Sequence, residues 1–481
     1  MKLNDLIKNI TVKEIIGSTD VEIENLYFDS NSVTKNSLYF CLNGTKTDGH
    51  QYSLQAEKHG AVAVVCERRL NVNVTQIIVE SSREAMSIIA GEFYGRADKS
   101  LKIIGVTGTN GKTTTTHLIY QILKNAGKNC ALIGTLGTFY SEKFIQPTLT
   151  TPDPIELNKQ LRDMLCVGVE FVVMEVSAHA LYFDKVKGID FTAVIFTNFT
   201  QDHLDFFGSM AEYKKAKLKL FREYNFKYSI VNSDDPVGIE IYNEIAGSIS
   251  YGIDNPADVF AIRVKEFKNG TEFIINLFDE ISTVKIPLIG RFNAYNAMSA
   301  LTASALLGID ANLAVDCINK ANCVSGRLEK VHDGEFSVFV DYAHTPDGLQ
   351  KSLTALRKIC NGRLICVFGC GGNRDKLKRS EMGKISGKLA DFTIITSDNP
   401  RYEEPMEIIS DIEKGILKVS KKYLLIQDRT DAIEYALKFA KEKDVVLIAG
   451  KGCENYQEIL GIKCLYNDKD TVEELLRSNK T

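Results

Sequence analysis

The run from Lys102 to Thr114 combines residue types that bind the phosphates of a nucleotide. An apolar stretch leads into Gly108, Thr109, Asn110, Gly111, Lys112, Thr113 and Thr114. Glycines let backbone N–H groups curl around phosphate oxygens, and the helix that follows presents the positive end of its dipole. The Lys112 ammonium can reach the β- and γ-phosphates, and the Thr113 hydroxyl can bind Mg²⁺. The spacing therefore predicts a phosphate loop for ATP.

This loop departs from the strict G-x-x-x-x-G-K-[ST] pattern, because Val106 occupies the first glycine position. A glycine-rich turn that binds nothing is the alternative. The flanks favour the phosphate loop, since a strand is expected at Lys102–Thr107 and an amphipathic helix after the loop. The apolar stripe of that helix contains Leu118, Ile119, Ile122 and Leu123. The helix is expected to end near Gly127. The loop predicts a nucleotide without specifying the reaction.

A carboxylate and an imidazole follow two further apolar strands of the same region. Glu175 ends the expected strand Phe171–Val176, and His203 comes a few residues after the expected strand Ala193–Thr197. The carboxyl ends of parallel strands line the ligand crevice of such a sheet. The pair therefore predicts a cation site near the phosphates. Taken singly, each residue fits equally well a hydrogen-bonded position at a strand end.

Lys217 stands out among the four lysines of the segment Tyr213–Phe221. At 100° per residue Lys217 falls inside the apolar arc, whereas the other three lysines point away from it. Burial lowers the pKa of an amine and favours the neutral form, which can react with CO₂ to give a carbamate. The alternative is a stem packed on the core with its ammonium reaching water.

Bulk composition narrows the class of protein. The 481 residues are 44% hydrophobic and 25% charged with a net charge of −4, so neither nucleic acid nor a membrane surface is expected as a partner. No apolar run reaches the ~18–20 residues that span a bilayer, and the N-terminus lacks a signal-peptide core. Eleven cysteines occur without a C-x-x-C pair, and Cys166 and Cys366 fall in apolar, strand-like runs. Reduced, packed cysteines in a cytoplasmic protein are therefore expected, without zinc.

Strand-like and helix-like stretches alternate along the chain, which predicts an α/β fold with largely parallel sheets. We expect three domains, 1–98, 99–327 and 328–481, with the polar stretch Gly95–Ser100 as the first linker. A doubly wound sheet is expected in the third domain. Its apolar strand-like runs are Phe336–Val340, Leu364–Phe368, Phe392–Thr396 and Val445–Ala449.

Six motifs in order along the chain resemble those of the Mur ligase family, over essentially the whole length. They are the loop Gly108–Thr114, Glu175-Val176-Ser177-Ala178-His179, the run Thr197–Asp205, Tyr213-x-x-Ala216-Lys217-x-x-Leu220-Phe221, Gly326-Arg327-Leu328-Glu329 and Asp341-Tyr342-Ala343-His344-Thr345-Pro346. The resemblance implies an N-terminal α/β domain that binds a UDP-sugar, a central P-loop ATPase-like domain with a mainly parallel sheet, and a C-terminal Rossmann-like domain for an amino acid. It also implies a monomer.

The same resemblance assigns roles around ATP, which is a substrate. It implies that Lys112, Glu175, His203 and Lys217 are catalytic and that Lys217 is carbamylated (N6-carboxylysine). Mg²⁺ is then bound by Thr113, Glu175, His203 and the Lys217 carbamate. Asn293 and Asn296 match the family's adenine-side stretch. Arg327 and Asp341 match residues that contact ATP once the C-terminal domain closes.

For the UDP-sugar substrate, UDP-MurNAc-L-Ala-D-Glu, the resemblance implies two groups of contacts. The uridine end matches Phe28, Ser30, Thr45, Lys46 and Thr47, and the peptidyl part matches Thr150, Thr151, Ser177 and Lys185. The chain departs from the family pattern at three positions. Asn31 and Lys185 stand where arginine is usual, and Cys453 stands where histidine is common. Lysine keeps the charge at position 185 but loses the two-pronged geometry of a guanidinium.

Arg401 follows another apolar strand and is held behind a proline, so it can form a two-pronged pair with a carboxylate. A surface turn with a solvated arginine is the alternative interpretation. In the family, Asp-Asn-Pro-Arg resembles the signature of enzymes that add meso-diaminopimelate, and lysine-adding relatives usually lack this arginine. The implied diaminopimelate contacts are Arg374, Asp398, Asn399, Pro400, Arg401, Gly450 and Glu454.

The expected reaction is ATP-dependent ligation of meso-diaminopimelate to the γ-carboxylate of D-Glu through an acyl phosphate, a step in peptidoglycan precursor synthesis. L-Lysine as the added amino acid is the nearest alternative. A folylpolyglutamate synthetase is more remote, because the chain has an N-terminal segment of uridine-binding type. A P-loop switch without ligase chemistry is the alternative from another class, and it needs no acceptor domain.

Overall fold

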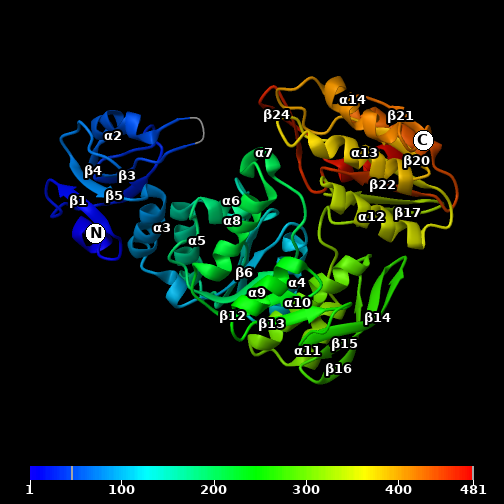
Figure 1. Ribbon diagram of the computed structural model, residues 1–481, viewed down its shortest axis with the longest axis horizontal. Coiled ribbons are helices and arrows are strands. Elements are labelled where there is room, and N and C mark those ends of the chain that lie inside the picture. Colours follow the sequence, from blue (N-terminus) through cyan, green and yellow to red (C-terminus); the bar gives the residue numbers. More distant parts are fainter. Residues whose placement is uncertain (45–46, 479–481) are drawn as a thin grey trace. The chain divides into compact units, whose positions relative to one another are not determined.

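The computed structural model describes residues 1–44 and 47–478, and Figure 1 shows its helices and strands. The fold is α/β, as the sequence predicts, with mixed and mostly parallel sheets. Two compact units divide the chain. The first comprises Met1–Thr107, Gly127–Ile195 and Lys215–Ser229, and the second comprises Gly108–Ala126, Phe196–Lys214 and Ile230–Thr481.

A five-stranded sheet with the order β1-β5-β4-β3-β2 forms the N-terminal part of the first unit. Its strands are parallel except for the antiparallel pair β1–β5. Leu38 and Phe40 pack with the helix α3, whereas Tyr39 and Cys41 belong to a cluster on the α2 side. The alternation of a strand thus fills both faces. The elements are α1 (Leu3–Leu6), β1 (Val12–Ile16), β2 (Asn25–Tyr27), β3 (Ser37–Phe40), η1 (Gly49–Tyr52), α2 (Ser53–His59), β4 (Ala61–Cys66), β5 (Thr75–Val79) and α3 (Ser82–Phe93).

The stretch expected to be a linker is ordered around an ion pair. The Arg96 guanidinium donates two hydrogen bonds to the buried Asp98 carboxylate, at 2.9 and 2.8 Å. This pair anchors the short helix η2 (Ala97–Lys99), which lies next to the first strand of the central sheet.

The remaining strands of the first unit follow the order β11-β6-β10-β7-β8-β9. The strands β6, β10 and β7 are parallel and lie in register, with Val173 opposite Ile104 and Leu132. Every residue of β7 and β10 is buried, and so is every residue of β6 after Lys102. This burial explains their continuous apolar sequences. The elements here are β6 (Lys102–Thr107), β7 (Cys130–Gly134), β8 (Gly137–Tyr140), β9 (Lys143–Ile145), α5 (Pro154–Cys166), β10 (Phe171–Glu175), α6 (Ala178–Tyr182) and β11 (Phe191–Phe196).

In the second unit the helix that follows the phosphate loop packs against α10 and α11. The strands β12, β13 and β14 are parallel, and β14, β15 and β16 form an antiparallel meander. The elements here are α4 (Lys112–Asn125), α7 (Leu204–Phe207), α9 (Pro236–Glu244), β13 (Ile249–Gly252), β14 (Val259–Phe267), β15 (Gly270–Leu277), β16 (Glu280–Ile286), α10 (Arg291–Leu306) and α11 (Ala311–Asn319). The helix α8 (Met210–Arg222) and the strand β12 (Phe226–Asn232) contain residues of both units.

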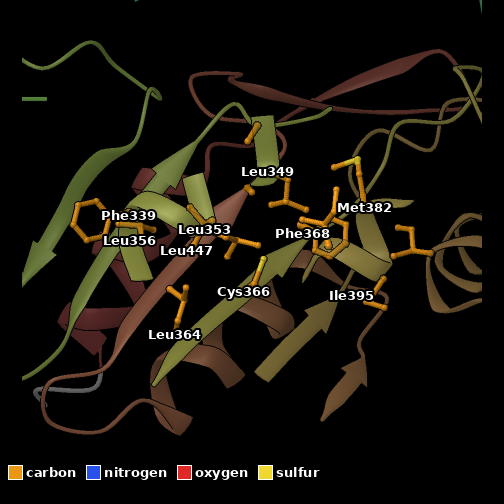
Figure 2. Packing of buried hydrophobic residues seen from close by; sticks show 14 of the residues in the cluster. Phe339, Leu349, Leu353, Leu356, Leu364, Cys366, Phe368, Met382, Ile395 and Leu447 are labelled. Carbon is orange, nitrogen blue, oxygen red and sulfur yellow. The ribbon is translucent and has the colours of Figure 1, made fainter. Parts of the chain in front are cut away.

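The C-terminal sheet has the order β17-β18-β22-β19-β20-β21 and is parallel except for β17–β18. Figure 2 shows one of its two cores, in which Cys366 and Phe368 of β19 meet helices α12 and α13. Ile365 and Val367 point into the other core, toward α15. The elements are β17 (Glu329–Asp333), β18 (Ser337–Asp341), α12 (Pro346–Ile359), β19 (Leu364–Phe368), α13 (Leu377–Leu389), β20 (Phe392–Ile395), α14 (Pro405–Ile416), β21 (Tyr423–Leu425), α15 (Arg429–Phe439), β22 (Val445–Ala449), β23 (Tyr456–Ile459), β24 (Ile462–Leu465) and α16 (Asp468–Ser478).

The structure confirms each strand named above to within two residues. One expectation was wrong: Cys166 ends the helix α5 and is exposed, whereas Cys366 lies in a buried strand. The buried apolar residues Leu157, Leu161 and Met164 of α5 are spaced by four and three residues, so the run before Cys166 follows the period of a helix. Every cysteine is a free thiol. Within residues 1–44 and 47–478, no helix has both the length and the apolar character needed to cross a membrane.

Candidate active site

The phosphate loop joins β6 to α4, as expected, and its two glycines have conformations that other residues avoid. Gly108 and Gly111 have φ of +143° and +89°. A Cβ on Gly108 would lie 1.9 Å from Thr197 Oγ1, and one on Gly111 would lie 2.5 Å from Asn296 Oδ1. The Lys112 ammonium donates to the carbonyl oxygens of Gly108 and Thr109, both at 2.9 Å. The Lys112 side chain thus folds back and binds the backbone of its own loop.

The segment after β11 supports this loop. Asn110 N–H donates to Asn198 Oδ1 at 3.0 Å, and the Asn110 carbonyl accepts from Thr197 Oγ1 at 2.6 Å. The Asn110 amide donates to the Asp347 carboxylate of α12 at 2.8 Å. These bonds fix the backbone whose N–H groups face a phosphate in a loop of this kind.

Asn293 and Asn296, expected on the adenine side, are buried and hydrogen-bonded within the protein. The Asn296 amide donates to Asn293 Oδ1 at 2.9 Å, and the Asn293 amide donates to the Ile289 carbonyl at 2.9 Å. Thr115 Oγ1 of α4 lies 3.4 Å from Asn296 Oδ1. The structure therefore places Asn296 against the phosphate loop, where it supports α4.

Arg327 reaches the loop from the segment that precedes β17. Its Nη2 donates to Thr113 Oγ1 at 2.9 Å, and its guanidinium carbon lies 4.4 Å from the centroid of the Tyr342 ring. Asp341 is buried, and its carboxylate accepts from the N–H groups of Leu328 and Tyr342 at 3.0 and 2.9 Å. Burial raises the pKa of Asp341, although a hydrogen bond from Ser352 opposes that shift. Asp341 thereby fixes the turn that presents Arg327.

His203 adopts the left-handed conformation, with φ of +54°, just before α7. Its Nε2 lies 3.4 Å from Asp202 Oδ2, and His344 Nε2 lies 3.7 Å from the same oxygen. Burial opposes ionisation of Asp202, but the hydrogen bond with His344 and the charges of both histidines outweigh it and lower its pKa. Asp202 is therefore an anion between two imidazoles, and sequence inspection had singled out only His203.

Glu175 lies at the carboxyl end of β10 beside the residues expected to contact the peptidyl substrate. Its carboxylate accepts from the N–H and the hydroxyl of Thr135, at 2.8 and 3.2 Å. Thr150 Oγ1 lies 3.1 Å from the Thr135 hydroxyl. The buried Thr151 hydroxyl donates to the Glu175 carbonyl at 2.8 Å and lies 3.4 Å from Ser177 Oγ. The structure thus gathers Thr150, Thr151, Glu175 and Ser177.

Two lysines complete the candidate residues of this unit. Lys185 forms an ion pair at 2.8 Å with Asp153, and Asp153 lies three residues after Thr150 in sequence. Lys217 lies on α8 with only 1% of its surface exposed. The prediction that it lies on the apolar face is confirmed. The alternative, an ammonium that reaches water, is wrong at this degree of burial.

The residues expected at the uridine end lie in the N-terminal sheet domain. Ser30 is buried, and its hydroxyl donates to Gln55 Oε1 at 3.2 Å, while Phe28 is exposed. The Thr47 carbonyl accepts from Gly44 N–H at 2.9 Å. Thr45 and Lys46, which the resemblance also implicates, lie outside the described residues.

A buried polar cluster follows β20 and β22 in the C-terminal domain. Asn399 donates from its amide to Glu454 Oε2 at 2.8 Å, and the fully buried Lys451 donates to Asn399 Oδ1 and Glu454 Oε2 at 3.0 and 3.1 Å. Burial opposes ionisation of Asp398, but the charges of Lys451 and Arg429 lower its pKa. A Cβ on Gly450 would lie 2.6 Å from Asp398 Oδ2. The Lys451 ammonium thus holds the oxygens of Asn399 and Glu454 together.

Arg374 and Arg401 both approach Gly371. A Cβ on that glycine would lie 2.9 Å from Arg401 Nη1 and 3.6 Å from Arg374 Cγ. Arg374 is half exposed, and its Nη1 lies 3.9 Å from Asp205 Oδ2. The Arg401 side chain is 18% exposed and donates from Nη1 to the Gly372 carbonyl at 2.8 Å. Pro400 precedes it in the same loop. Arg401 thus follows the polar residues Asp398 and Asn399 in one loop, whereas the Arg374 guanidinium lies near Asp205.

Several residues of these sites gave no sequence signal of their own. Asp347 and Glu458 look like ordinary surface acids, and their partners lie far away in sequence, at Asn110 and Arg401. Lys451 offered a signal, because it stands within the glycine-rich run that also supplied Gly450 and Glu454.

The set of candidate metal ligands is small and rich in oxygen. Among the described residues, no three His, Cys, Asp or Glu side chains group together in the manner of a metal site. Thr113 and His203 belong to the second unit, and Glu175 and Lys217 belong to the first.

A phosphate loop between a strand and a helix, together with a doubly wound C-terminal sheet, defines a nucleotide-dependent α/β protein. Family models match three stretches: "Mur ligase family, catalytic domain" at 22–94, "Mur ligase middle domain" at 106–304, and "Mur ligase, glutamate ligase domain" at 326–452. The chain belongs to the Mur ligase family.

Curated relatives match along the whole chain. The UDP-N-acetylmuramoyl-L-alanyl-D-glutamate–2,6-diaminopimelate ligase 1 of Clostridium acetobutylicum is 43% identical over 484 residues, covering 99% of each chain. The corresponding ligase of Syntrophomonas wolfei is 43% identical over 487 residues, again covering 99% of each. A solved structure of a ligase with the same printed name gives a TM-score of 0.72 at 31% identity, covering 100% of this chain and 99% of that one.

Proposed function

We propose that this protein is an ATP-dependent amide ligase that joins meso-2,6-diaminopimelate to the D-glutamate γ-carboxylate of UDP-MurNAc-L-Ala-D-Glu. One observation carries the choice of amino acid. Arg374 and Arg401 both approach Gly371, in the domain that holds the buried Asp398 and the partly exposed Glu454, so this part of the chain supplies guanidinium groups for carboxylates. Full-length relatives named as diaminopimelate ligases support the same assignment.

The reaction divides into two displacements. An oxygen of the γ-carboxylate attacks the γ-phosphorus of ATP, the bond to the β,γ-bridging oxygen breaks, and ADP leaves. The amine of diaminopimelate then attacks the acyl carbon, the carbon–oxygen bond breaks, and phosphate leaves with loss of a proton from nitrogen. In the first step two anions must meet, so cationic groups at the phosphates lower the barrier. Lys112 supplies that charge, and Arg327, already bonded to Thr113, stands at the same loop.

Magnesium, when bound, supplies further positive charge at the phosphates. Thr113 and His203 are proposed ligands from the second unit, and Glu175 and Lys217 from the first. Lys217 acquires an anionic oxygen only if its amine adds CO₂, giving Lys–NH–COO⁻ and releasing a proton. Its burial, with 1% of its surface exposed, supports that chemistry by keeping the amine away from bulk water.

The peptidyl substrate is proposed to bind at Thr150, Thr151, Ser177 and Lys185, beside Glu175. The uridine end is proposed to bind at Phe28, Ser30 and the loop 44–49, which includes Thr45, Lys46 and Thr47. Three domains with boundaries near 98 and 327, a monomer, and a cytoplasmic location remain part of the proposal. The free thiols support a reducing compartment.

Phosphate release by the full chain tests the proposal directly. With ATP and magnesium present, release should require both UDP-MurNAc-L-Ala-D-Glu and meso-diaminopimelate, and the product should be the tripeptide. L-Lysine in place of diaminopimelate should support far slower release, because it leaves a partly buried guanidinium without its anion. Equal ATP turnover without either substrate would contradict ligase chemistry. Equal turnover with lysine would contradict the choice of amino acid.

A folylpolyglutamate synthetase and a nucleotide switch are the remaining alternatives. The family match at 22–94 covers an N-terminal domain, and the match at 326–452 covers a ligase domain that a switch does not need. Competition between a UDP-sugar and a folate for the full chain separates the first alternative from the proposal.

A further inference from the structure

The hairpin β23–β24 is a separate two-stranded sheet, and every residue of β24 is exposed. The hairpin is hydrogen-bonded to the loop 398–401 at four places, three in β23 and one at Leu460, which follows that strand. Gln457 Nε2 donates to the Asp398 carbonyl at 2.8 Å, and Glu458 N–H donates to Asn399 Oδ1 at 2.9 Å. Arg401 N–H donates to the Glu458 carbonyl at 3.0 Å, and Leu460 N–H donates to the Arg401 carbonyl at 2.7 Å.

Arg401 needs this support because its backbone is strained. Its φ of +54° lies in the left-handed region, which a residue with a side chain adopts only when its surroundings impose it. Both its N–H and its carbonyl are bonded to the hairpin, so the hairpin supplies that constraint.

The Arg401 side chain is held at two of its nitrogens. Nε donates to Glu458 Oε2 at 3.2 Å, and Nη1 donates to the Gly372 carbonyl at 2.8 Å. A guanidinium has five N–H donors, so Nη1 and Nη2 retain donors for a carboxylate. Holding the long side chain in place before the substrate arrives removes much of the entropy cost of binding.

We propose that Glu458 is a positioning residue that determines specificity for the added amino acid by orienting Arg401. This inference rests on the proposed function. Glu458 does not need to touch the substrate. It fixes the plane of the guanidinium, so that the Nη1–Nη2 edge meets the distal carboxylate of a dicarboxylic diamino acid.

Steady-state kinetics of the full chain test this role. Glu458→Ala should raise the KM for meso-diaminopimelate about tenfold and leave kcat within about twofold, because binding is affected rather than chemistry. The KM values for ATP and for UDP-MurNAc-L-Ala-D-Glu should not change. Glu458→Gln, which keeps an oxygen acceptor for Nε, should recover part of the loss.

Lys463→Ala is the matched control. Lys463 is the cross-strand partner of Glu458 in the hairpin, and its ammonium lies 4.3 Å from the centroid of the Tyr456 ring. Its removal perturbs the hairpin without touching Arg401, so the KM for meso-diaminopimelate should stay at the wild-type value. A rise as large as that of Glu458→Ala would mean that hairpin stability, and not orientation of Arg401, sets the KM.

A double-mutant cycle completes the test. In an Arg401→Ala background, Glu458→Ala should have no further effect on the KM for diaminopimelate, because the two residues act in series. Additive effects would overturn the inference while leaving the ligase assignment intact. Wild-type protein that shows no diaminopimelate-dependent phosphate release, or that prefers lysine, would overturn both the proposed acceptor and this inference.

Discussion

Lys217 places an amine in a position that is almost fully buried, with 1% of its surface exposed. If its carbamate is a metal ligand, Lys217→Ala should lower kcat by at least about a hundredfold, as loss of a transition-state charge contact does. Acetate should partly restore Lys217→Ala, because it supplies a carboxylate to the space left by the side chain. Lys217→Arg, which fills that space with a cation, should not be rescued.

Labelling with ¹³C-bicarbonate gives the direct measurement, a carbamate carbon resonance present in the wild-type chain and missing in Lys217→Ala. Lys215→Ala serves as the control, since Lys215 is an exposed lysine of the same helix. A fully active Lys217→Ala chain, or a wild-type chain without the resonance, would remove Lys217 from the mechanism.

The ionisation of a single residue, Glu403, should make the stability of the folded chain depend on pH. Hydrogen bonding from the fully buried Arg379 lowers the pKa of Glu403 from 4.5 to about 2. A carboxyl group whose pKa is depressed on folding stabilises the folded state above its unfolded pKa. That contribution should be lost as the pH falls from about 4.5 toward 2.

Urea unfolding of the wild type and of Glu403→Gln at several pH values measures this contribution. The variant should be less stable near neutral pH, and the difference should shrink through the acid window as Glu403 becomes protonated. A difference that stays constant with pH would show that the ionised form of Glu403 contributes nothing.

At the scale of elements, the phosphate loop between β6 and α4 packs closely at two glycines, Gly108 against Thr197 and Gly111 against Asn296. Gly111→Ala should raise the KM for ATP by more than about tenfold, because its Cβ would collide with Asn296, which supports α4. The KM for diaminopimelate should stay unchanged. Gly127→Ala is the matched control: φ is also positive there, at +73°, but nothing lies within 4 Å of its Cβ. An equal rise in the KM for ATP in both variants would show that the positive φ, and not the contact with Asn296, causes the loss.

Elements were predictable from sequence where their burial determines which residue types they contain. The strands β6, β19 and β22 match their expected bounds, because each is a short apolar run that is buried over nearly its whole length. Lys217 was predicted to be buried because helical periodicity alone places it among apolar neighbours. Contacts such as Glu458–Arg401 were not predictable, since they join residues that neither pattern nor periodicity links.

Asn296 shows that a motif match does not predict which neighbours a side chain contacts. Its match to the family predicts a place on the adenine side, which stays a prediction, and the structure adds that its side chain is buried against the phosphate loop and Asn293. A motif records that a residue matters at a position, but the packing of α10 on α4 decides which neighbours its side chain meets.

At the scale of the whole molecule, the residues proposed for the two displacements belong to different parts of the sequence. Lys112 and Lys217 precede residue 328, whereas Arg374, Arg401 and the acids Asp398 and Glu454 lie in the C-terminal Rossmann-like domain. An enzyme built in this way should allow one displacement to be removed by mutation without the other.

Hydroxylamine provides the test, because it attacks an acyl phosphate and gives a stable hydroxamate. With ATP and UDP-MurNAc-L-Ala-D-Glu but no diaminopimelate, the wild-type chain should form the D-glutamyl γ-hydroxamate. Arg401→Ala should still form it at a rate close to that of the wild type, while tripeptide formation falls, because only the second displacement needs the bound amino acid. Lys217→Ala should form neither product. If Arg401→Ala lost hydroxamate formation as completely as Lys217→Ala, phosphorylation would depend on an intact amino-acid site, and the two displacements would be coupled through the whole chain.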